Sequence, residues 1–358
     1  MKANGNSDLI LALNQIEKEK GISKEILLEA LENSLLVACK NQYGKSENIH
    51  VNINRETGSV AVYAEKEIVE TVEDPATQID AVEAKVKFPK NEIGEFVRIE
   101  VTPKNFGRIA AQKAKQVVVQ KIREEERKGL YEQYFSMEKE LVTGIVQRYV
   151  GNNVSVNLGK VDAILTENEQ VRGERFRPTE RIKLYIVEVK DTTKGPKITV
   201  SRTHPELVKR LFEAEVTEVK DGTVEIKSIA REAGSRTKMA VWTENPDVDP
   251  VGACVGVNGA RVNAIVEELR GEKIDIITWS EDPAVLIENA LSPAKVVSVT
   301  VDEEEKSAEV VVPDYQLSLA IGKEGQNARL AARLTNYKID IKSESQVGLV
   351  PTEPPVEE

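Results

Sequence analysis

The sequence predicts a multidomain α+β protein: an N-terminal α/β domain, a small closed β-barrel and two tandem copies of one α-β-β-α-α-β unit. The chain has 358 residues, too many for one hydrophobic core. Short β-prone segments separated by turn residues fill residues 136–200, as in small barrels. Downstream, a Gly-x-x-Gly sequence occurs twice, and Lys-Ile-Asp-Ile follows it after 17 and 16 residues, which indicates an internal repeat.

Residues 1–135 form the predicted N-terminal domain. Apolar residues recur at helical spacing in residues 8–40 and predict two helices. Residues 49–64 alternate apolar and polar side chains around a turn, as two half-buried strands do. Residues 105–134 hold no proline and predict one long charged helix, with a break at Gly129. This helix either joins the domain to the rest of the chain as a strut or is an ordinary solvated surface helix.

Residues 136–200 form the predicted barrel, which we assign to the OB type. They are the only net-positive segment, with 11 basic and 9 acidic side chains. OB barrels bind single strands through a basic groove and stacking aromatic residues. Arg148 and Tyr149 are therefore candidate RNA contacts, and Phe176 is a further candidate aromatic. The alternative is a barrel that serves protein contacts.

The repeated units, residues 201–278 and 279–345, have the helix and strand order of prokaryotic-type (type II) KH domains. Their loops are Gly256-Val257-Asn258-Gly259 and Gly322-Lys323-Glu324-Gly325. Glycine permits the tight turn between two helices and lets a ligand backbone approach closely. The unpaired amides at the start of the second helix then suit a phosphodiester. A tight turn without a ligand is the alternative, and the repetition argues against it.

Polar side chains around the two loops are further candidate RNA contacts. Lys323 is placed to neutralise a phosphate, and the apolar surface beside each loop is placed to take the bases. The remaining candidates are Arg202, Arg231, Arg236, Lys238, Arg261, Asn327 and Arg329. Arg329 and Arg333 share a helix face, so pairing with carboxylates on the barrel or the first KH unit is an alternative role for them.

The net charge of −11 argues against indiscriminate nucleic-acid binding. The acidity is concentrated in residues 279–358, which hold 7 basic and 15 acidic side chains. Much of it lies in the run at 302–305 and in a predicted disordered tail at 346–358. Basic faces elsewhere are compatible with this distribution. We expect a modest RNA affinity that depends largely on the geometry at the helix ends.

The sequence offers no support for catalysis or a metal site. Its two histidines have no cysteine or carboxylate at ligand or triad spacing, and no G-x-x-x-x-G-K-[ST] phosphate loop occurs. We therefore expect a protein without enzyme activity, metal or cofactor. Cys39 and Cys254 lie in apolar surroundings, as buried thiols of a reducing cytosol do. No apolar run reaches 18 residues, so we expect no membrane span. We also expect the protein to be cytoplasmic and a monomer.

This order of domains resembles the NusA family of bacterial transcription elongation factors over nearly the whole chain. The most specific stretch runs from Asp-Pro-Val-Gly-Ala-Cys-Val-Gly at 249–256 to Gly-Glu-Lys-Ile-Asp-Ile at 271–276. Residues 201–205 and 230–238 are also similar to that family. The resemblance implies an S1-type OB barrel between the N-terminal domain and the two KH domains. It also implies that Val154 stands where many S1 domains have a stacking aromatic, which weakens the barrel as an RNA reader.

The resemblance implies partners and a function. The N-terminal domain is expected to bind RNA polymerase near the RNA exit channel, while the S1 and KH domains hold single-stranded nascent RNA. Together they modulate pausing, termination and antitermination, with other Nus-type elongation factors as further partners. The chain resembles the shorter members of the family, without acidic C-terminal repeats. The rival functions are a ribosome-associated and an RNA-decay-associated KH/S1 protein, because such domains also accompany phosphorolytic exoribonucleases.

Overall fold

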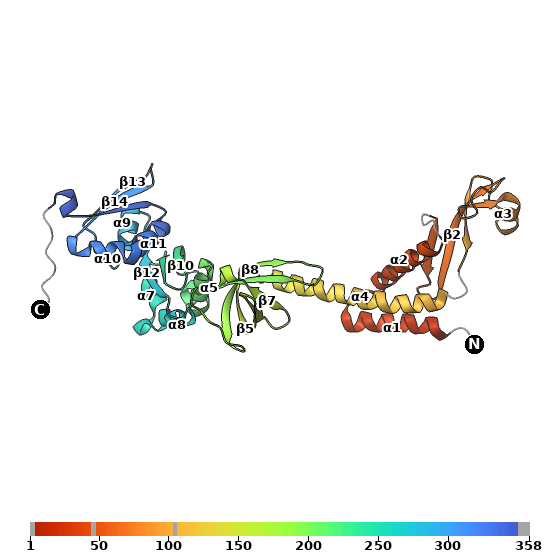
Figure 1. Ribbon diagram of the computed structural model, residues 1–358, viewed down its shortest axis with the longest axis horizontal. Helices are drawn as coiled ribbons and strands as arrows, with labels where there is room; N and C mark the ends of the chain where they lie inside the picture. The colour runs from red at the N-terminus through yellow and green to blue at the C-terminus, as the bar shows by residue number, and fades with distance from the viewer. Residues whose placement is uncertain (1–3, 44–47, 103–105, 350–358) are drawn as a thin grey trace. The chain divides into compact units, whose positions relative to one another are not determined.

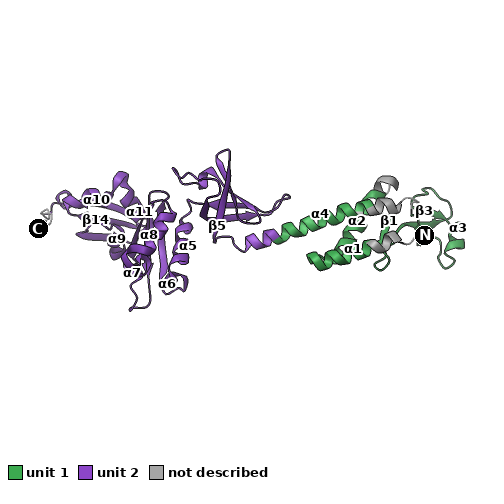
Figure 2. Cartoon of the chain, turned by 90° about the horizontal axis from the view of Figure 1, so that it is seen from below, with its two compact units in different colours: residues 1–129 green, residues 130–358 purple. Residues whose placement is uncertain are grey.

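The computed structural model describes residues 4–43, 48–102 and 106–349. The chain divides into two compact units, residues 1–129 and 130–358 (Figure 2). The first unit holds the N-terminal α/β domain, and the second holds the barrel and both repeated units (Figure 1). Each unit has its own buried cores, so each is described by itself.

The first unit packs helices against a four-stranded sheet. Its helices are α1 (Asn4–Lys20), α2 (Lys24–Tyr43), α3 (Ala81–Lys87) and most of α4 (Phe106–Phe135). Its strands are β1 (Ile49–Ile53), β2 (Val60–Val69), β3 (Gln78–Asp80) and β4 (Phe96–Glu100), and β2 pairs with the other three. Leu27, Leu31 and Leu35 recur on one face of α2 and share a core with Ile53 and Val62 of the sheet.

Helix α4 corrects one expectation. The predicted break at Gly129 is wrong, because α4 is continuous from Phe106 to Phe135. A glycine inside a helix costs only about 1 kcal/mol relative to alanine, and the helix formers on either side outweigh that cost. Strands β3 and β4 and helix α3 are too short for a periodic pattern to predict them.

The barrel is closed by five strands in the order β5-β6-β7-β9-β8. The strands are β5 (Leu141–Val150), β6 (Asn153–Asn157), β7 (Asp162–Leu165), β8 (Arg181–Lys190) and β9 (Lys197–Ser201). Alternate residues of each strand point inward, and Val154, Val156 and Leu184 are fully buried there. The closed barrel predicted from the turn spacing is confirmed, and it is S1-like, as the family resemblance implies.

The two repeated units share one topology. The first contains α5 (Pro205–Glu215), α6 (Thr217–Lys220), β10 (Glu225–Glu232), β11 (Arg236–Trp242), α7 (Pro250–Val255), α8 (Ala260–Glu268) and β12 (Lys273–Thr278). The second contains α9 (Pro283–Ala290), β13 (Ser298–Asp302), β14 (Ser307–Val312), α10 (Leu317–Ile321), α11 (Gln326–Thr335) and β15 (Lys338–Ser343). In each sheet an antiparallel pair is extended by a parallel third strand, the pairing expected for a type II KH domain.

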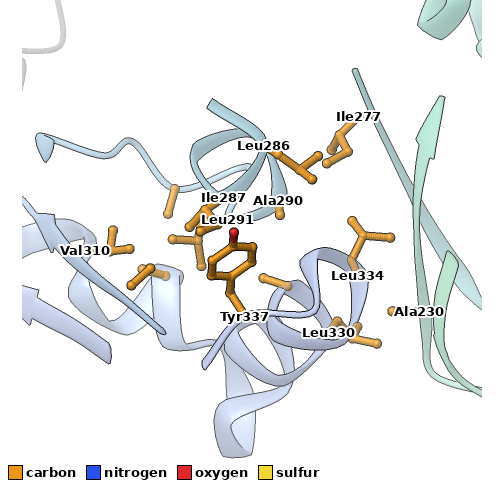
Figure 3. Packing of buried hydrophobic residues seen from close by; sticks show 14 of the residues in the cluster. Ala230, Ile277, Leu286, Ile287, Ala290, Leu291, Val310, Leu330, Leu334 and Tyr337 are labelled. Carbon is orange, nitrogen blue, oxygen red and sulfur yellow. The ribbon is translucent and has the colours of Figure 1, made fainter. Parts of the chain in front are cut away.

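A shared hydrophobic core joins the two KH domains. Ala230 and Ile277 of the first domain lie in one buried cluster with Leu286, Leu330 and Leu334 of the second (Figure 3). The short connection between the domains, from β12 to α9, keeps these faces together. The two KH domains therefore pack as one body. Beyond β15 a short helical turn covers Ser345–Val347, and residues 350–358 of the predicted tail lie outside the described residues.

Candidate nucleic-acid interface

The two Gly-x-x-Gly loops have the same backbone conformation. Their first glycines have φ/ψ of 75°/174° and 76°/171°, and their second x residues, Asn258 and Glu324, both have 53°/27°. Their last glycines follow at 75°/13° and 73°/17°. The repeat in the sequence is thus a repeat in local geometry, although the residues between the glycines differ completely.

The first glycine of each loop has no room for a side chain. A Cβ at Gly256 would lie 2.8 Å from Cγ of Arg261, and one at Gly322 would lie 2.8 Å from the backbone nitrogen of Asn327. Both glycines also have a positive φ, which L-residues rarely adopt. Glycine therefore allows each preceding helix to approach the helix that follows it.

Helices α8 and α11 begin at these loops without a side-chain cap. Gly259 and Gly325 occupy their N-cap positions and provide no side-chain acceptor. By contrast, Asp249 and Asp282 cap α7 and α9 through their carboxylates. The first amides of these helices, on Ala260 and Gln326, donate to the carbonyls of Val257 and Lys323, so they are not the unpaired donors predicted from the sequence. The positive end of each helix dipole still favours an anion at the loop.

Exposed side chains surround the loops. Val257 is 83% exposed, and Asn258, Lys323 and Glu324 are also exposed. Beside the second loop, Leu319 and Ile321 of α10 present apolar surface to solvent. A groove of about 650 Å³ lies where the two KH domains meet. Its lining includes Asp249, Ile276, Thr278, Asn289, Lys295 and Val296.

The arginines that follow the loops are paired within the protein. Arg261 donates through Nη1 to the carbonyl of Ala253 at 2.7 Å and to Oε2 of Glu218 at 3.0 Å. Arg329 donates through Nε to Oε1 of Glu232, 3.1 Å away on the first KH domain. The alternative role predicted for Arg329, pairing with a carboxylate of the first KH domain, is therefore confirmed. Glu218 and Glu232 were not predicted from the sequence as the partners of these arginines.

Arg202 and Arg231, two other candidate RNA contacts, lie inside the protein. Arg231 forms a two-fold ion pair with Glu272, and both side chains are 1% exposed. Arg202 is also 1% exposed and links Glu174 of the barrel to Glu268 of α8, at 2.5 and 3.0 Å. This conformation corrects their assignment as direct RNA contacts, because neither guanidinium reaches the surface.

Lys238 and Asn327 are buried as well. Lys238 Nζ donates to the carbonyl of Ser292 at 2.7 Å and lies 3.3 Å from Asp275, and burial lowers the pKa of its ammonium. Asn327 donates to the carbonyls of Leu291 and Ala320. Lys238 thus links the first KH domain to the second, and Asn327 ties α11 to neighbouring segments of the second, so their assignment as RNA contacts is also corrected. Arg236 is half-buried in an ion pair with Asp275.

Comparison with known proteins identifies the family. Models for the NusA N-terminal domain, the NusA-like first KH domain and the NusA-like second KH domain match residues 8–128, 202–279 and 283–348. The transcription termination/antitermination protein NusA of Bacillus subtilis is 57% identical over 351 residues, covering 97% of this chain and 95% of that protein. The chain belongs to the NusA family.

Other NusA proteins are similar over nearly the same length. That of Halalkalibacterium halodurans is 58% identical over 341 residues, covering 95% of this chain and 89% of that protein. That of Thermus thermophilus is 41% identical over 345 residues, covering 93% and 89%. The solved N-terminal domain of the Bacillus subtilis NusA is 52% identical, with a TM-score of 0.31, and covers 34% of this chain and 98% of that structure.

The barrel of this NusA-family chain keeps two of its candidate contacts at the surface. Arg148 is exposed, and Tyr149 is 48% exposed with its phenol oxygen accepting from the Phe176 amide at 3.0 Å. Phe176 itself is buried, and Arg270 of the first KH domain covers its ring at 4.8 Å. Phe176 is thus a core residue and not a stacking surface. Val154 is also in the barrel core, so an aromatic there would not face solvent in this barrel.

The described parts of this NusA-family chain show two further negative findings. Among them, no group of three or more His, Cys, Asp or Glu side chains is arranged to hold a metal ion. None of the helices within these ranges is long and apolar enough to cross a membrane.

Proposed function

We propose that this protein is an RNA-binding transcription elongation factor that binds RNA polymerase and nascent RNA and modulates pausing, termination and antitermination. One observation carries the proposal: two Gly-x-x-Gly loops with the same backbone geometry lie in a chain of the NusA family. The relatives that it matches are named transcription termination/antitermination proteins. KH domains use such loops to clamp single-stranded RNA.

The loops are suited to phosphate and the neighbouring surface to bases. Helices α8 and α11 begin at the loops without a side-chain cap, and the positive ends of their dipoles favour a sugar-phosphate backbone there. Lys323 is exposed within the second loop and supplies a cation. Leu319 and Ile321 supply apolar surface beside it. The groove between the two KH domains gives a strand a route from one domain to the other.

The loop hypothesis is tested with four substitutions that place carboxylates against the phosphates. We expect the variant V257D/N258D/K323D/E324D to lose most of its affinity for a single-stranded RNA while its circular dichroism stays native. The matched control, K85D/K90D, makes the same total charge change at exposed lysines of the N-terminal unit and should bind RNA like the parent protein. An unchanged RNA affinity in a folded loop variant contradicts the clamp.

RNA polymerase binding is a separate part of the proposal. The N-terminal unit has its own hydrophobic core and is matched by the NusA N-terminal model. A fragment of residues 1–135 should therefore bind the polymerase in the absence of RNA. Calorimetry that detects no binding counts against this part alone. Transcription in vitro on a pausing template, with and without the full chain, then measures the effect on pausing and termination.

The rival functions give different outcomes. Capture of ribosomal subunits without RNA polymerase favours a ribosome-associated role. Phosphate-dependent degradation of RNA by the purified protein favours a role in RNA decay. The names of the relatives agree with neither rival, because they describe transcription termination and antitermination.

A further inference from the structure

A carboxylate of the first KH domain lies inside a cluster of polar side chains from the second. Glu232, the last residue of β10, accepts from Gln326 Nε2 at 2.8 Å and from Arg329 Nε at 3.1 Å. Arg333 Nη1 lies 4.0 Å from the same carboxylate. These three residues follow each other at spacings of three and four on α11, so they share one helix face. Gln326 also donates to the Ser235 hydroxyl at 2.7 Å.

This cluster has the chemistry of a phosphate site. Arg329 faces both oxygens of Glu232, with Nη2 3.5 Å from the second, and a guanidinium presents the same fork of donors to phosphate. Hydrogen bonds from Gln326 and Arg329 lower the pKa of Glu232, so its carboxylate is an anion at neutral pH. These side chains therefore already bind an anion, the carboxylate of Glu232.

The cluster is next to the second Gly-x-x-Gly loop and open to solvent. Arg329 also donates through Nη1 to the carbonyl of Glu324 inside the loop. The side chains of Arg329 and Arg333 are 48% and 58% exposed, whereas that of Glu232 is 23% exposed. A strand clamped by the loop thus passes within reach of two arginines whose present partner is an internal carboxylate.

We propose that Gln326, Arg329 and Arg333 form a phosphate subsite beside the second loop, which Glu232 occupies until an RNA phosphodiester takes its place. The inference rests on the proposed function, because the ligand is the strand that the loop holds. The exchange does not require the KH domains to separate. Leu330 and Leu334, on the adjacent buried face of α11, stay in the core shared with the first domain (Figure 3).

The decisive variant is E232Q, which keeps the size and one accepting oxygen but removes the charge. Binding of the full chain to a labelled, unstructured RNA oligonucleotide is measured by fluorescence anisotropy at several salt concentrations. We expect E232Q to bind roughly two- to fivefold more tightly than the parent protein, as release of an exposed ion pair predicts. The plot of log affinity against log salt should steepen by roughly 0.7, the value for one further phosphate on a single strand.

A matched control is E309Q, which removes the same charge from the exposed pair of Glu309 with Lys342 Nζ, 2.7 Å apart. We expect its affinity to change by less than about twofold, because it releases no cation beside the loop. R329Q and R333Q should have the opposite effect to E232Q, with weaker binding and a shallower salt slope. Thermal unfolding checks that each variant is folded.

Each outcome decides between the possibilities. The subsite is wrong if E232Q binds with unchanged or lower affinity, or if E309Q gains as much. Should E232Q fail to fold, R333Q decides, because Arg333 is exposed and its unchanged affinity and slope would overturn the subsite. If the parent protein does not bind the oligonucleotide at all, the proposed function fails, whatever the role of Glu232.

Discussion

Removal of the buried Arg231 guanidinium should destabilise the first KH domain. Glu272 accepts four hydrogen bonds: two from Arg231, one from the Thr237 hydroxyl at 2.6 Å and one from the Gly234 amide at 2.8 Å. Although burial raises the pKa of Glu272, its hydrogen bonds with Arg231 bring that pKa below the ordinary value. R231A leaves a charged carboxylate 1% exposed with two of its four donors. Breaking such a pair costs about 3–5 kcal/mol.

Urea unfolding followed by tryptophan fluorescence measures this cost. The chain has two tryptophans, and both report on this region, since Trp242 ends β11 and Trp279 follows β12. With a slope of about 2 kcal/mol per molar urea, the loss corresponds to a midpoint lowered by about 2 M. The double variant R231M/E272M removes both charges and should recover at least half of that loss.

R236A is the matched control on the next strand. Arg236 pairs with Asp275 at 2.7 Å, but its side chain is 27% exposed, so the expected loss is below about 1 kcal/mol. The structural role of Arg231 is wrong if R231A unfolds at the same urea concentration as the parent protein while its RNA affinity falls. That result would make Arg231 an RNA contact and not a structural residue.

Three further predictions follow from single residues. G322A should weaken RNA binding at least tenfold because its methyl group meets the Asn327 backbone at 2.8 Å, whereas G348A, with the same φ of 76° but open space around it, should bind RNA normally in the same assay. Burial raises the pKa of Cys254 to about 11 and also raises the pKa of Cys39. Neither thiol should therefore react with Ellman's reagent at pH 8 until the chain is unfolded, and rapid reaction of the native protein contradicts this. The lowered pKa of Glu232 means that its ion pairs stabilise the protein fully above the ordinary pKa of 4.5 and are lost as the pH falls through the lowered value. The melting temperatures of E232Q and the parent protein should therefore differ at pH 6 and converge at acid pH, and a difference that stays constant as the pH is lowered contradicts this.

Local signals in the sequence were enough to predict the barrel and the loops. Polar turn residues at 151–153 separate two apolar runs, and β5 ends before them at Val150 while β6 begins at Asn153. The spacing from each glycine loop to Lys-Ile-Asp-Ile predicted the order of helix and strand in both KH domains. Gly129 shows the limit of such signals, because a single residue does not outweigh a long run of helix formers.

The roles of the basic residues depend on contacts that are distant in sequence. Arg231 and Glu272 are 41 residues apart, and Arg329 and Glu232 are 97 apart, so no local pattern relates them. One such partner, Asp275, could be predicted from the strand topology alone. In the parallel register of β11 and β12, Lys238 lies opposite Asp275, which places an acid beside this lysine once the KH fold is assumed. Burial of that lysine follows only from the packing of the second domain against the first.

Most of the candidate cations in this chain, whose net charge is −11, are paired within the protein, and this pairing limits how the chain binds RNA. The following candidates each have a carboxylate within 4 Å: Arg202, Arg231, Arg236, Lys238, Arg261 and Arg329. Their charges are neutralised before any RNA arrives, so few of them release counterions from a strand. Binding must then rely on the helix ends at the two loops, which carry no net charge, and on the few cations beside them, Lys323 and the subsite of Arg329 and Arg333. RNA affinity should accordingly fall only gently with salt, because its slope counts the phosphates that free cations neutralise.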